Sequence, residues 1–280
     1  MTAVGTIARI TKTMQMIATA KFTAALARAR DSRPYTDAIR KLVGEVSGAA
    51  GDYDSPLFSS QGKTGKELLL VISSDRGLCG AYNGNIFKTA MKYIRSSKPR
   101  EVEVAVDVAG KKAGAFFKFQ KMPISAQIVV GDKPKFEDVA KVADRYMEEF
   151  SKGEWDAIHI AYMRFESNAK QVPETIQLLP LESQNSTSSE DLAATANYDF
   201  SPSANEILDD LLPRSIKTTL FQVFNDAVVS ENIMRMVAMK AATENANDLG
   251  KDLRRDYNRA RQAQITTELT EIISGAAALE

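Results

Sequence analysis

The longest uninterrupted helical pattern in this sequence is IKTTLFQVFNDAVVSENIMRMVAMKAATENANDLGKDLRRDYNRARQAQITTELTEIISGAAALE, residues 216–280. It contains no proline, and Gly250 is its only glycine before Gly275. A continuous helix of about 60 residues is about 90 Å long at 1.5 Å per residue. No ordinary globular core needs that length, so the helix requires a second long helix as partner. The stripe predicted to face that partner is Ile216, Leu220, Val223, Ala227, Met234, Val237 and Ala241.

Residues 1–56 supply the candidate partner helix. A 3-4-3-4 spacing, typical of coiled coils, predicts a seam of Ile7, Ile10, Met14, Ile17, Lys21, Ala24 and Arg28. After a phase shift, the pattern resumes at Tyr35, Ile39, Leu42, Val46 and Ala49. Pro34 lies between the two runs and predicts a bend or break there. Through residue 41 this helix carries eight Lys and Arg residues but only two acidic ones, so it is basic within a neutral protein.

Residues 65–182 change to a pattern of strands that alternate with helices. Strands are predicted at 68–73, 102–108, 124–130, 156–165 and 172–181, and helices at 81–96, 110–119 and 135–151. Such alternation is typical of a doubly wound α/β sheet. The expected fold class is therefore α/β: a long antiparallel coiled coil of the N- and C-terminal helices with an inserted Rossmann-like domain. The expected divisions are 1–56, 65–182, a loop segment at 183–204, and 205–280.

Composition excludes several function classes. The formal net charge is zero, which provides no global field for nucleic acid or an anionic membrane. No apolar run approaches the roughly 20 residues that span a bilayer, and no signal or transit peptide is evident at the start. With one cysteine and one histidine, Cys/His zinc sites are excluded. We expect no metal, no cofactor and no direct bilayer insertion.

The stretch SSDRGLCG, residues 73–80, follows a strand and precedes a helix, where a phosphate-binding loop would lie. Its spacing matches neither G-x-G-x-x-G nor G-x-x-x-x-G-K-[ST], so a tight βα turn is the favoured interpretation. Cys79 lies near a helix N-terminus, which can lower a thiol pKa. Its only possible base, His159, lies in an apolar strand and fits a core histidine better. The sequence offers no catalytic constellation.

The C-terminal helix carries a cluster of arginines followed by Gln262. The arginines are Arg254, Arg255, Arg259 and Arg261. Nearby aspartates at helical spacing allow a solvated, salt-bridged face. Arginine and glutamine also make directional hydrogen bonds to carboxylates and carbonyls, so a recognition stripe is equally open. The last turns are apolar and mostly small, which suits either a surrounding sleeve or a frayed end.

Four blocks of the chain, in order, resemble the gamma subunit family of F-type ATP synthases. The first is ITKTMQMIATAK (residues 10–21) with RPY (33–35), and the second is the SSDRGLCG loop. The third is MVAMKAATENA (236–246), and the fourth is YNRARQAQITTEL (257–269) with ISGAAA (273–278). The resemblance covers almost the whole chain. In this family the front helix continues through the proline.

The resemblance implies a non-catalytic central rotor inside a ring of three alpha and three beta subunits. It implies that residues coupling rotation to the beta subunits are Met14, Cys79, Arg235, Arg261, Gln262, Thr266 and Glu268. The loop at 77–80 would face an acidic lever on beta. Tyr198 and Phe200 match a foot that meets the epsilon (or delta-type) subunit and the membrane c-ring. The implied location is the cytoplasmic face of a bacterial plasma membrane or the matrix face of the mitochondrial inner membrane.

The sequence departs from the family pattern in two ways. It starts later than usual, without most of the basic turns that precede the position of Ile7, and it lacks the cysteine-pair insertion of the chloroplast relatives. Two rival interpretations remain at this point. An α/β enzyme with helical dimerisation arms would bind ATP or ADP, and a plain coiled-coil scaffold would form homodimers.

Overall fold

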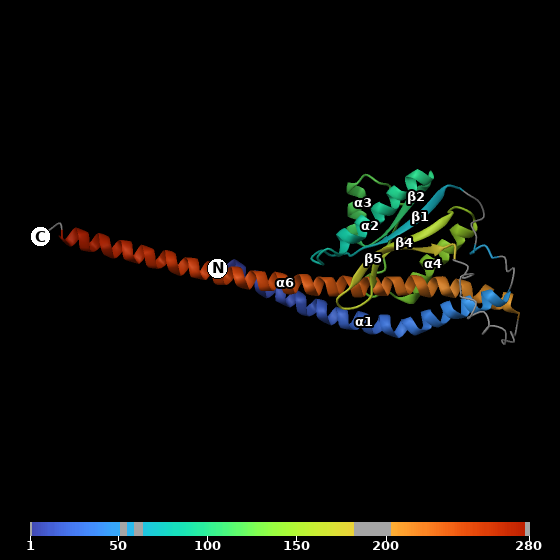
Figure 1. Cartoon of the computed structure of the whole chain (residues 1–280), viewed down its shortest axis with the longest axis horizontal. Coiled ribbons are helices and arrows are strands. Elements are labelled where there is room, and N and C mark those ends of the chain that lie inside the picture. The colour runs from blue at the N-terminus through green and yellow to red at the C-terminus, as the bar shows by residue number, and fades with distance from the viewer. Residues whose placement is uncertain (1, 51–54, 59–63, 182–202, 278–280) are drawn as a thin grey trace.

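A computed structural model describes residues 2–50, 55–58, 64–181 and 203–277 of the chain. Two long helices, α1 (Thr2–Ala50) and α6 (Ala204–Ala277), lie side by side, and an α/β domain sits against one side of the pair (Figure 1). With 74 residues, α6 is about 110 Å long. Its length is greater than predicted.

Polar contacts show that the two helices run antiparallel. Thr11 Oγ1 lies 2.8 Å from Thr243 Oγ1, and Ser32 Oγ lies 2.8 Å from Gln222 Oε1. Residue numbers therefore fall along α6 as they rise along α1. The predicted antiparallel coiled coil of the two terminal helices is confirmed.

The predicted seam of the first half of α1 is wrong by one residue. The side chains of Ile7, Ile10 and Ile17 are 53–54% exposed, whereas Phe22 is buried together with three alanines, Ala18, Ala25 and Ala29. Small side chains let the two helix backbones approach closely, and Phe22 fills the remaining space against Phe165 of the α/β domain. The large apolar residues Ile7, Ile10 and Ile17 follow a neighbouring side of α1, about 100° around the helix, and stay exposed.

The other predicted stripe positions were correct in part. On α1, Ile39 and Val46 are buried, but Tyr35 and Leu42 are exposed. On α6 the first four positions of the stripe, at residues 216–227, are buried, Met234 is half-buried, and Val237 is 54% exposed.

Pro34 does not break α1. The helix is continuous from Thr2 to Ala50 with the proline inside it, and Figure 1 shows α1 curving along α6. Contacts to α6 beside the proline hold this part of the helix, since Ser32 bonds Gln222 and Arg33 lies 3.7 Å from Asp226. These tertiary contacts oppose the loss of one backbone hydrogen bond.

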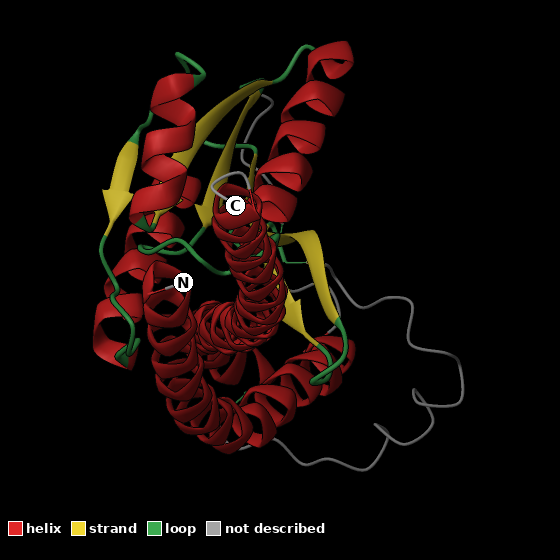
Figure 2. Cartoon of the chain, turned by 90° about the vertical axis from the view of Figure 1, so that its left-hand side faces the viewer, coloured by secondary structure: helices red, strands yellow, loops and turns green. Residues whose placement is uncertain are grey.

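The α/β domain contains a five-stranded sheet in the order β3-β2-β1-β4-β5. The strands β1 (Lys66–Ile72), β2 (Glu103–Ala109), β3 (Ala126–Ile128) and β4 (Ala157–Phe165) are parallel, and β5 (Gln171–Leu179) pairs antiparallel at the edge. The helices are α2 (Tyr82–Ser97), the 3₁₀ turn η1 (Lys98–Arg100), α3 (Lys111–Phe119) and α4 (Phe136–Ser151). Helices cover both faces of the sheet (Figure 2). The Rossmann-like, doubly wound arrangement is confirmed, with β3 shorter than predicted.

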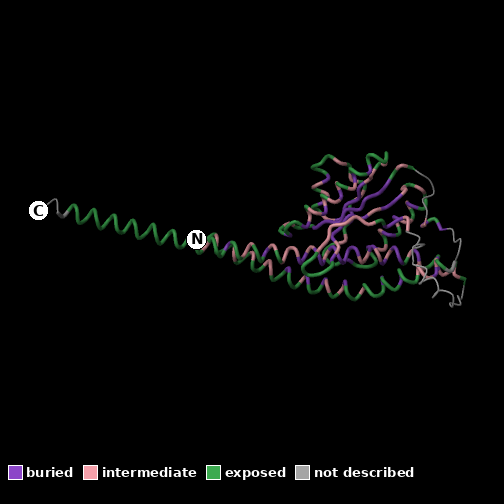
Figure 3. The backbone as a smooth tube through the Cα atoms, viewed as in Figure 1, coloured by how far each residue is buried: buried purple, intermediate pink, exposed green. Residues whose placement is uncertain are grey.

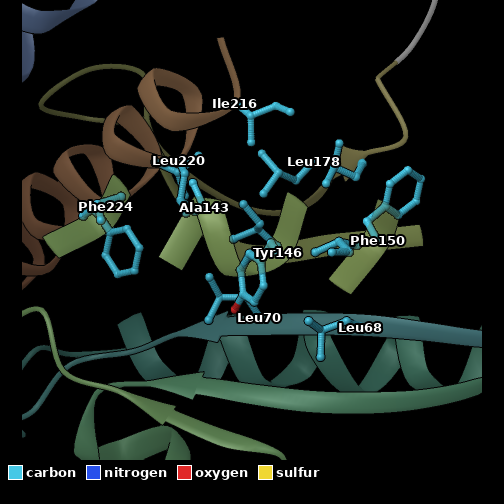
Figure 4. Close-up of a cluster of buried hydrophobic side chains, with 14 of the residues drawn as sticks. Leu68, Leu70, Ala143, Tyr146, Phe150, Leu178, Ile216, Leu220 and Phe224 are labelled. Atoms are coloured by element: carbon cyan, nitrogen blue, oxygen red, sulfur yellow. The ribbon is translucent and has the colours of Figure 1, made fainter. Parts of the chain in front are cut away.

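Alternation along β1 divides the core into two layers. Leu68 and Leu70 face α4 and the first half of α6, where Tyr146 and Leu220 pack (Figure 4). Leu69 and Val71 point the other way, toward α2 and α3. The helix α6 therefore covers one face of the sheet and also forms half of the coiled coil, which fixes the α/β domain to the coiled coil.

Candidate partner-binding surface

The last part of α6 has no neighbour within the described chain. Gly250 lies beside Val4, near the first described residue, and every residue from 251 to 275 is exposed (Figure 3). This segment projects alone beyond α1. Most helical stability in proteins comes from tertiary packing of one face of the helix, and this segment has no such packing within the described chain. It also exposes several large apolar side chains: Leu253, Tyr257, Ile265, Leu269, Ile272 and Ile273. A surface of this kind indicates a partner.

Four of the residues implied by the family resemblance lie on this projecting segment. Thr266 Oγ1 bonds the carbonyl of Gln262, and Glu268 accepts a hydrogen bond from Gln264. In the described part of the chain, the side chains of Arg261 and Gln262 have no polar partner. Both are therefore free to bind another molecule.

The four arginines of the cluster differ in their ion pairs. Arg255 pairs with Asp252 at 3.2 Å and with Asp256 at 3.8 Å, as a salt-bridged face requires. Arg254, Arg259 and Arg261 form no such pair with any described residue. The cluster is mostly a set of uncompensated, exposed guanidinium groups.

The remaining predicted residues lie elsewhere on the stalk. Arg235 is 33 positions before Glu268 on the same helix, a separation of about 50 Å. Met14 is half-buried on α1, and Cys79 belongs to the loop between β1 and α2. The structure therefore divides the predicted set into a projecting end and a loop region, with Met14 on the coiled coil.

Cys79 is buried, contrary to its implied role as a contact residue. Its side chain is 2% exposed, and its sulfur lies 3.3 Å from Asn83 Nδ2 and 3.7 Å from Ser74 Oγ. Asn83 also accepts a hydrogen bond from the Ser74 backbone N–H at 3.0 Å. The thiol is inside the loop and cannot touch a partner in this conformation. It shapes the loop instead.

The exposed tip of this loop is Leu78. Its side chain is 59% exposed, and its backbone has φ 62, a conformation unusual for leucine. Gly80 also has a positive φ and packs close to α6, beside Ala238 and the carbonyl of Met234. The internal bonds of the loop and this packing hold an apolar side chain out in solvent.

Arg235 of α6 supports the loop at residues 73–80 through hydrogen bonds. Its guanidinium donates to the carbonyl oxygens of Gly77 at 3.3 Å and Arg76 at 3.2 Å, and it pairs with Glu231 at 2.7 Å. Its side chain is 11% exposed. Burial raises the pKa of Glu231, Arg235 lowers it, and the nearby Asp132 and Asp75 raise it further. Arg235 is thus an internal support of the loop more than an exposed contact.

Asp132 connects the loop to the other long helix. Its carboxylate accepts from Lys21 of α1 at 2.5 Å and from Arg76 of the loop at 3.1 Å. The hydrogen bond from Lys21 is the largest cause that lowers the pKa of Asp132. Loop, α1 and α6 are therefore joined through Asp132 and Arg235. Asp132, Arg76 and Glu231 could not be found as members of this site from the sequence, because only the fold brings them together.

The start of α3 has no free backbone N–H group that could bind a phosphate. The first three backbone N–H groups of α3 are bonded: Lys111 to Asp75 Oδ1, Lys112 to the Ser74 carbonyl, and Ala113 to Ser73 Oγ. A helix N-terminus binds phosphate through such groups when they are free. A cavity of about 90 Å³ lies nearby, between the sheet and α6, and its lining includes Asp132 and Glu231, whose carboxylates are already paired with cations. This arrangement disfavours a bound phosphate at the start of α3.

Cys79 and His159 do not form a catalytic pair. His159 Nδ1 lies 2.8 Å from the hydroxyl oxygen of Tyr93, and burial lowers the pKa of His159. The side-chain neighbours of Cys79 are Ser74 and Asn83. Among the described residues there is no group of three His, Cys, Asp or Glu side chains that could hold a metal ion. None of the described helices is long and apolar enough to cross a membrane.

Fold and surface together define a class: a helical stalk protein that carries a Rossmann-like domain on its side and leaves one end of its longest helix bare. A family model described as ATP synthase matches residues 1–279. A protein of Rhodopirellula baltica named ATP synthase gamma chain is 41% identical over 280 residues, which cover 98% of this chain and 94% of the relative. One of the same name from Haemophilus influenzae is 40% identical over 272 residues, covering 97% and 94%. The chain belongs to the ATP synthase gamma chain family.

Solved structures agree with the fold. A chain of the Euglena gracilis mitochondrial ATP synthase (OSCP/F1/c-ring, rotational state 3) superposes with a TM-score of 0.66 at 20% identity, covering 99% of this chain and 91% of that one. A chain of the central stalk/c-ring of the Tetrahymena thermophila mitochondrial ATP synthase gives 0.61 at 20% identity, covering 84% and 99%.

Proposed function

We propose that this chain is the central rotor shaft of an F-type ATP synthase. In this role it couples proton-driven rotation of a membrane c-ring to ATP synthesis or hydrolysis at the beta subunits and does no catalysis itself. The single observation that carries the proposal is the bare end of α6, where residues 251–275 are all exposed. A helix with this much apolar surface requires an enclosing partner, and the names of the relatives indicate which assembly provides one.

The shaft acts by position. Each beta subunit meets a different side of the projecting helix, and it favours an open or a closed nucleotide site according to the contacts that side offers. This is a population shift driven by differential contact energy. Arg261, Gln262, Thr266 and Glu268 provide polar contacts worth on the order of 1 kcal/mol each. Leu78 and the loop around it provide a second contact lower on the shaft, facing the acidic lever of beta.

Torque requires that the contact surfaces do not slip relative to the driven end. The antiparallel α1 and α6 share a buried seam, and the Lys21–Asp132–Arg76 connection ties the loop to it. Met14 lies on the same coiled coil and completes the proposed contacts with beta. The alpha subunits form the rest of the sleeve.

The other end of the shaft is proposed to meet the epsilon (or delta-type) subunit and the c-ring through Tyr198 and Phe200, which lie outside the described residues. The division into segments 1–56, 65–182, 183–204 (loop and foot) and 205–280 is part of this proposal. So is a location on the cytoplasmic face of a bacterial plasma membrane, or the matrix face of the mitochondrial inner membrane, as a peripheral component.

The test is the double variant Arg261→Ala/Gln262→Ala in the assembled complex. We expect normal assembly but at least a tenfold loss of ATP-driven proton pumping per ATP hydrolysed. Arg255→Ala is the matched control and should leave coupling unchanged, because Arg255 is already paired with Asp252 and Asp256 on the same helix. Full coupling in the double variant would contradict the roles proposed for these two residues. Failure of the wild-type chain to assemble with alpha and beta subunits would contradict the proposal as a whole.

A further inference from the structure

The outer layer of the α/β domain, made of α2, η1 and α3, carries a strongly basic surface. Between residues 82 and 100, and again between 111 and 121, there is no acidic residue. The exposed cations of this surface are Lys88, Lys92, Arg95, Lys98, Lys111, Lys112, Lys118 and Lys121. None of the eight has a side-chain nitrogen within 4 Å of a carboxylate in the described part of the chain.

The opposite layer of the same domain has the reverse composition. In α4 five acidic residues stand against Lys141 and Arg145. Both of these cations are paired, Lys141 with Asp138 at 4.0 Å and Arg145 with Asp107 and Glu149. In a protein with zero net charge, the domain is therefore polarised across its sheet, with unpaired positive charge on the side away from the stalk. Such a field attracts and orients an acidic partner.

The same two helices carry an apolar strip formed by Phe87, Met91 and Phe116. Phe87 of α2 and Phe116 of α3 stack with their ring centroids 4.4 Å apart, and Met91 packs beside them. All three are half-buried, so the strip is recessed, and only Phe119 at the end of α3 stands out, at 83% exposed. Insertion into a bilayer needs protruding apolar side chains. A recessed apolar strip on a cationic surface instead fits an extended or helical protein segment laid along it.

We propose that the α2–α3 surface, formed by Phe87, Met91, Phe116, Phe119 and the eight cations, docks an acidic amphipathic segment of another subunit of the same assembly. The apolar side of that segment covers the aromatic strip, and its carboxylates pair with the lysines of the surface. The proposal rests on the proposed function in one respect, because it takes the assembly to be the ATP synthase. It concerns a different surface from the projecting helix and the loop at residues 73–80.

The test is zero-length carbodiimide cross-linking of the purified, assembled complex, followed by peptide mass spectrometry. This reagent joins a lysine amine to a carboxylate only when the two are in ion-pair contact. We expect products that join Lys88, Lys92 or Lys118 to Asp or Glu of another subunit, reduced at least fivefold in 0.5 M salt, where screening is strong. The absence of such products, with intersubunit products formed at lysines of other surfaces, would overturn the proposal.

A charge-reversal pair of variants makes the test independent of cross-linking chemistry. Lys88→Glu/Lys92→Glu/Lys118→Glu should lower recovery of the docked subunit at least tenfold, whereas Lys141→Glu/Lys152→Glu/Lys170→Glu, with the same change in net charge, should not. Equal effects of the two triples would overturn the proposal. So would binding of the full chain to phosphatidylcholine–phosphatidylglycerol vesicles that is abolished only by the first triple, because it would assign the surface to lipid. If the chain does not purify with ATP synthase subunits at all, the proposed function fails instead.

Discussion

Replacing Arg235 by alanine should destabilise the protein in a way that depends on pH. The change removes the 2.7 Å ion pair to Glu231 and both hydrogen bonds to the carbonyls of Arg76 and Gly77. The side chain of Glu231 is 15% exposed, so it is left as a largely buried carboxylate without its partner. Breaking one half of a buried pair costs about 3 kcal/mol in the free energy of unfolding near pH 7.5.

The sign of the pH effect follows from the pKa of Glu231. Burial already raises that pKa in the intact protein, and the loss of Arg235 raises it further. Between the unfolded and folded pKa values the folded state binds more protons, so the stability of the variant falls as pH rises from about 4.5. At pH 5 the cost should shrink to about 1 kcal/mol, which represents the lost loop hydrogen bonds.

Urea unfolding of the full chain at pH 5 and 7.5 measures both numbers, and hydrogen exchange of residues 75–80 reports on the loop. The double variant Glu231→Gln/Arg235→Ala is the control, because it removes the buried charge and should recover about 2 kcal/mol at pH 7.5. A cost that is the same at both pH values, or a double variant no more stable than the single one, would refute the assignment of Arg235 as a loop support.

Two further predictions concern the close approach at Gly110 and the buried carboxyl of Asp226. Gly110→Ala places a Cβ 2.2 Å from the Ser73 carbonyl oxygen at φ +92, so we expect a fall in Tm of more than 10 °C. Gly153→Ala is the control: its φ is +74, but nothing lies within 4 Å of the added Cβ, so Tm should fall far less. Equal falls in Tm would contradict the close approach of Gly110 to Ser73. Burial raises the pKa of Asp226 to about 6, Arg33 and Gln222 lower it in part, and its contribution to stability therefore declines as pH rises from about 4 to about 6. Relative to Asp226→Asn, wild-type stability measured by urea unfolding should drop by about 2 kcal/mol across that window, and parallel curves for the two proteins would be the contrary result.

The sequence was sufficient to predict the architecture because two different periodicities lie in separate segments. The uninterrupted pattern at residues 216–280 specified the long helix, and the alternation of strands and helices specified the sheet with nearly correct boundaries. The continuity of α1 could not be derived locally, since the contacts that carry it through Pro34 come from Gln222 and Asp226 on the other helix. The predicted register of the seam was wrong because small residues form the close contact. A search for periodic large apolar residues gives such small residues too little weight.

For the candidate site, only the exposure of Arg261 and Gln262 could be derived from local sequence, and their role as contacts stays a prediction. Arg261 and Gln262 are exposed because their helix has no neighbour, which follows from its length. The burial of Cys79 depends on Asn83 and Ser74 turning inward. The junction formed by Asp132 depends on the packing of α1 beside the α/β domain, which brings Lys21 and Asp132 into contact although they are 111 positions apart. Neither could be inferred from spacing along the chain.

In the proposed function, α1 and α6 move as one rigid body. The most direct test is to lock them together with a disulfide in the variant Thr11→Cys/Thr243→Cys, made in a Cys79→Ser background, at the point where the two hydroxyl oxygens are 2.8 Å apart. In the assembled complex, oxidation should leave ATP-driven proton pumping unchanged, because the bond joins two parts that never separate. Loss of pumping on oxidation, restored by reduction, would show that the helices must shift against each other and would contradict the account.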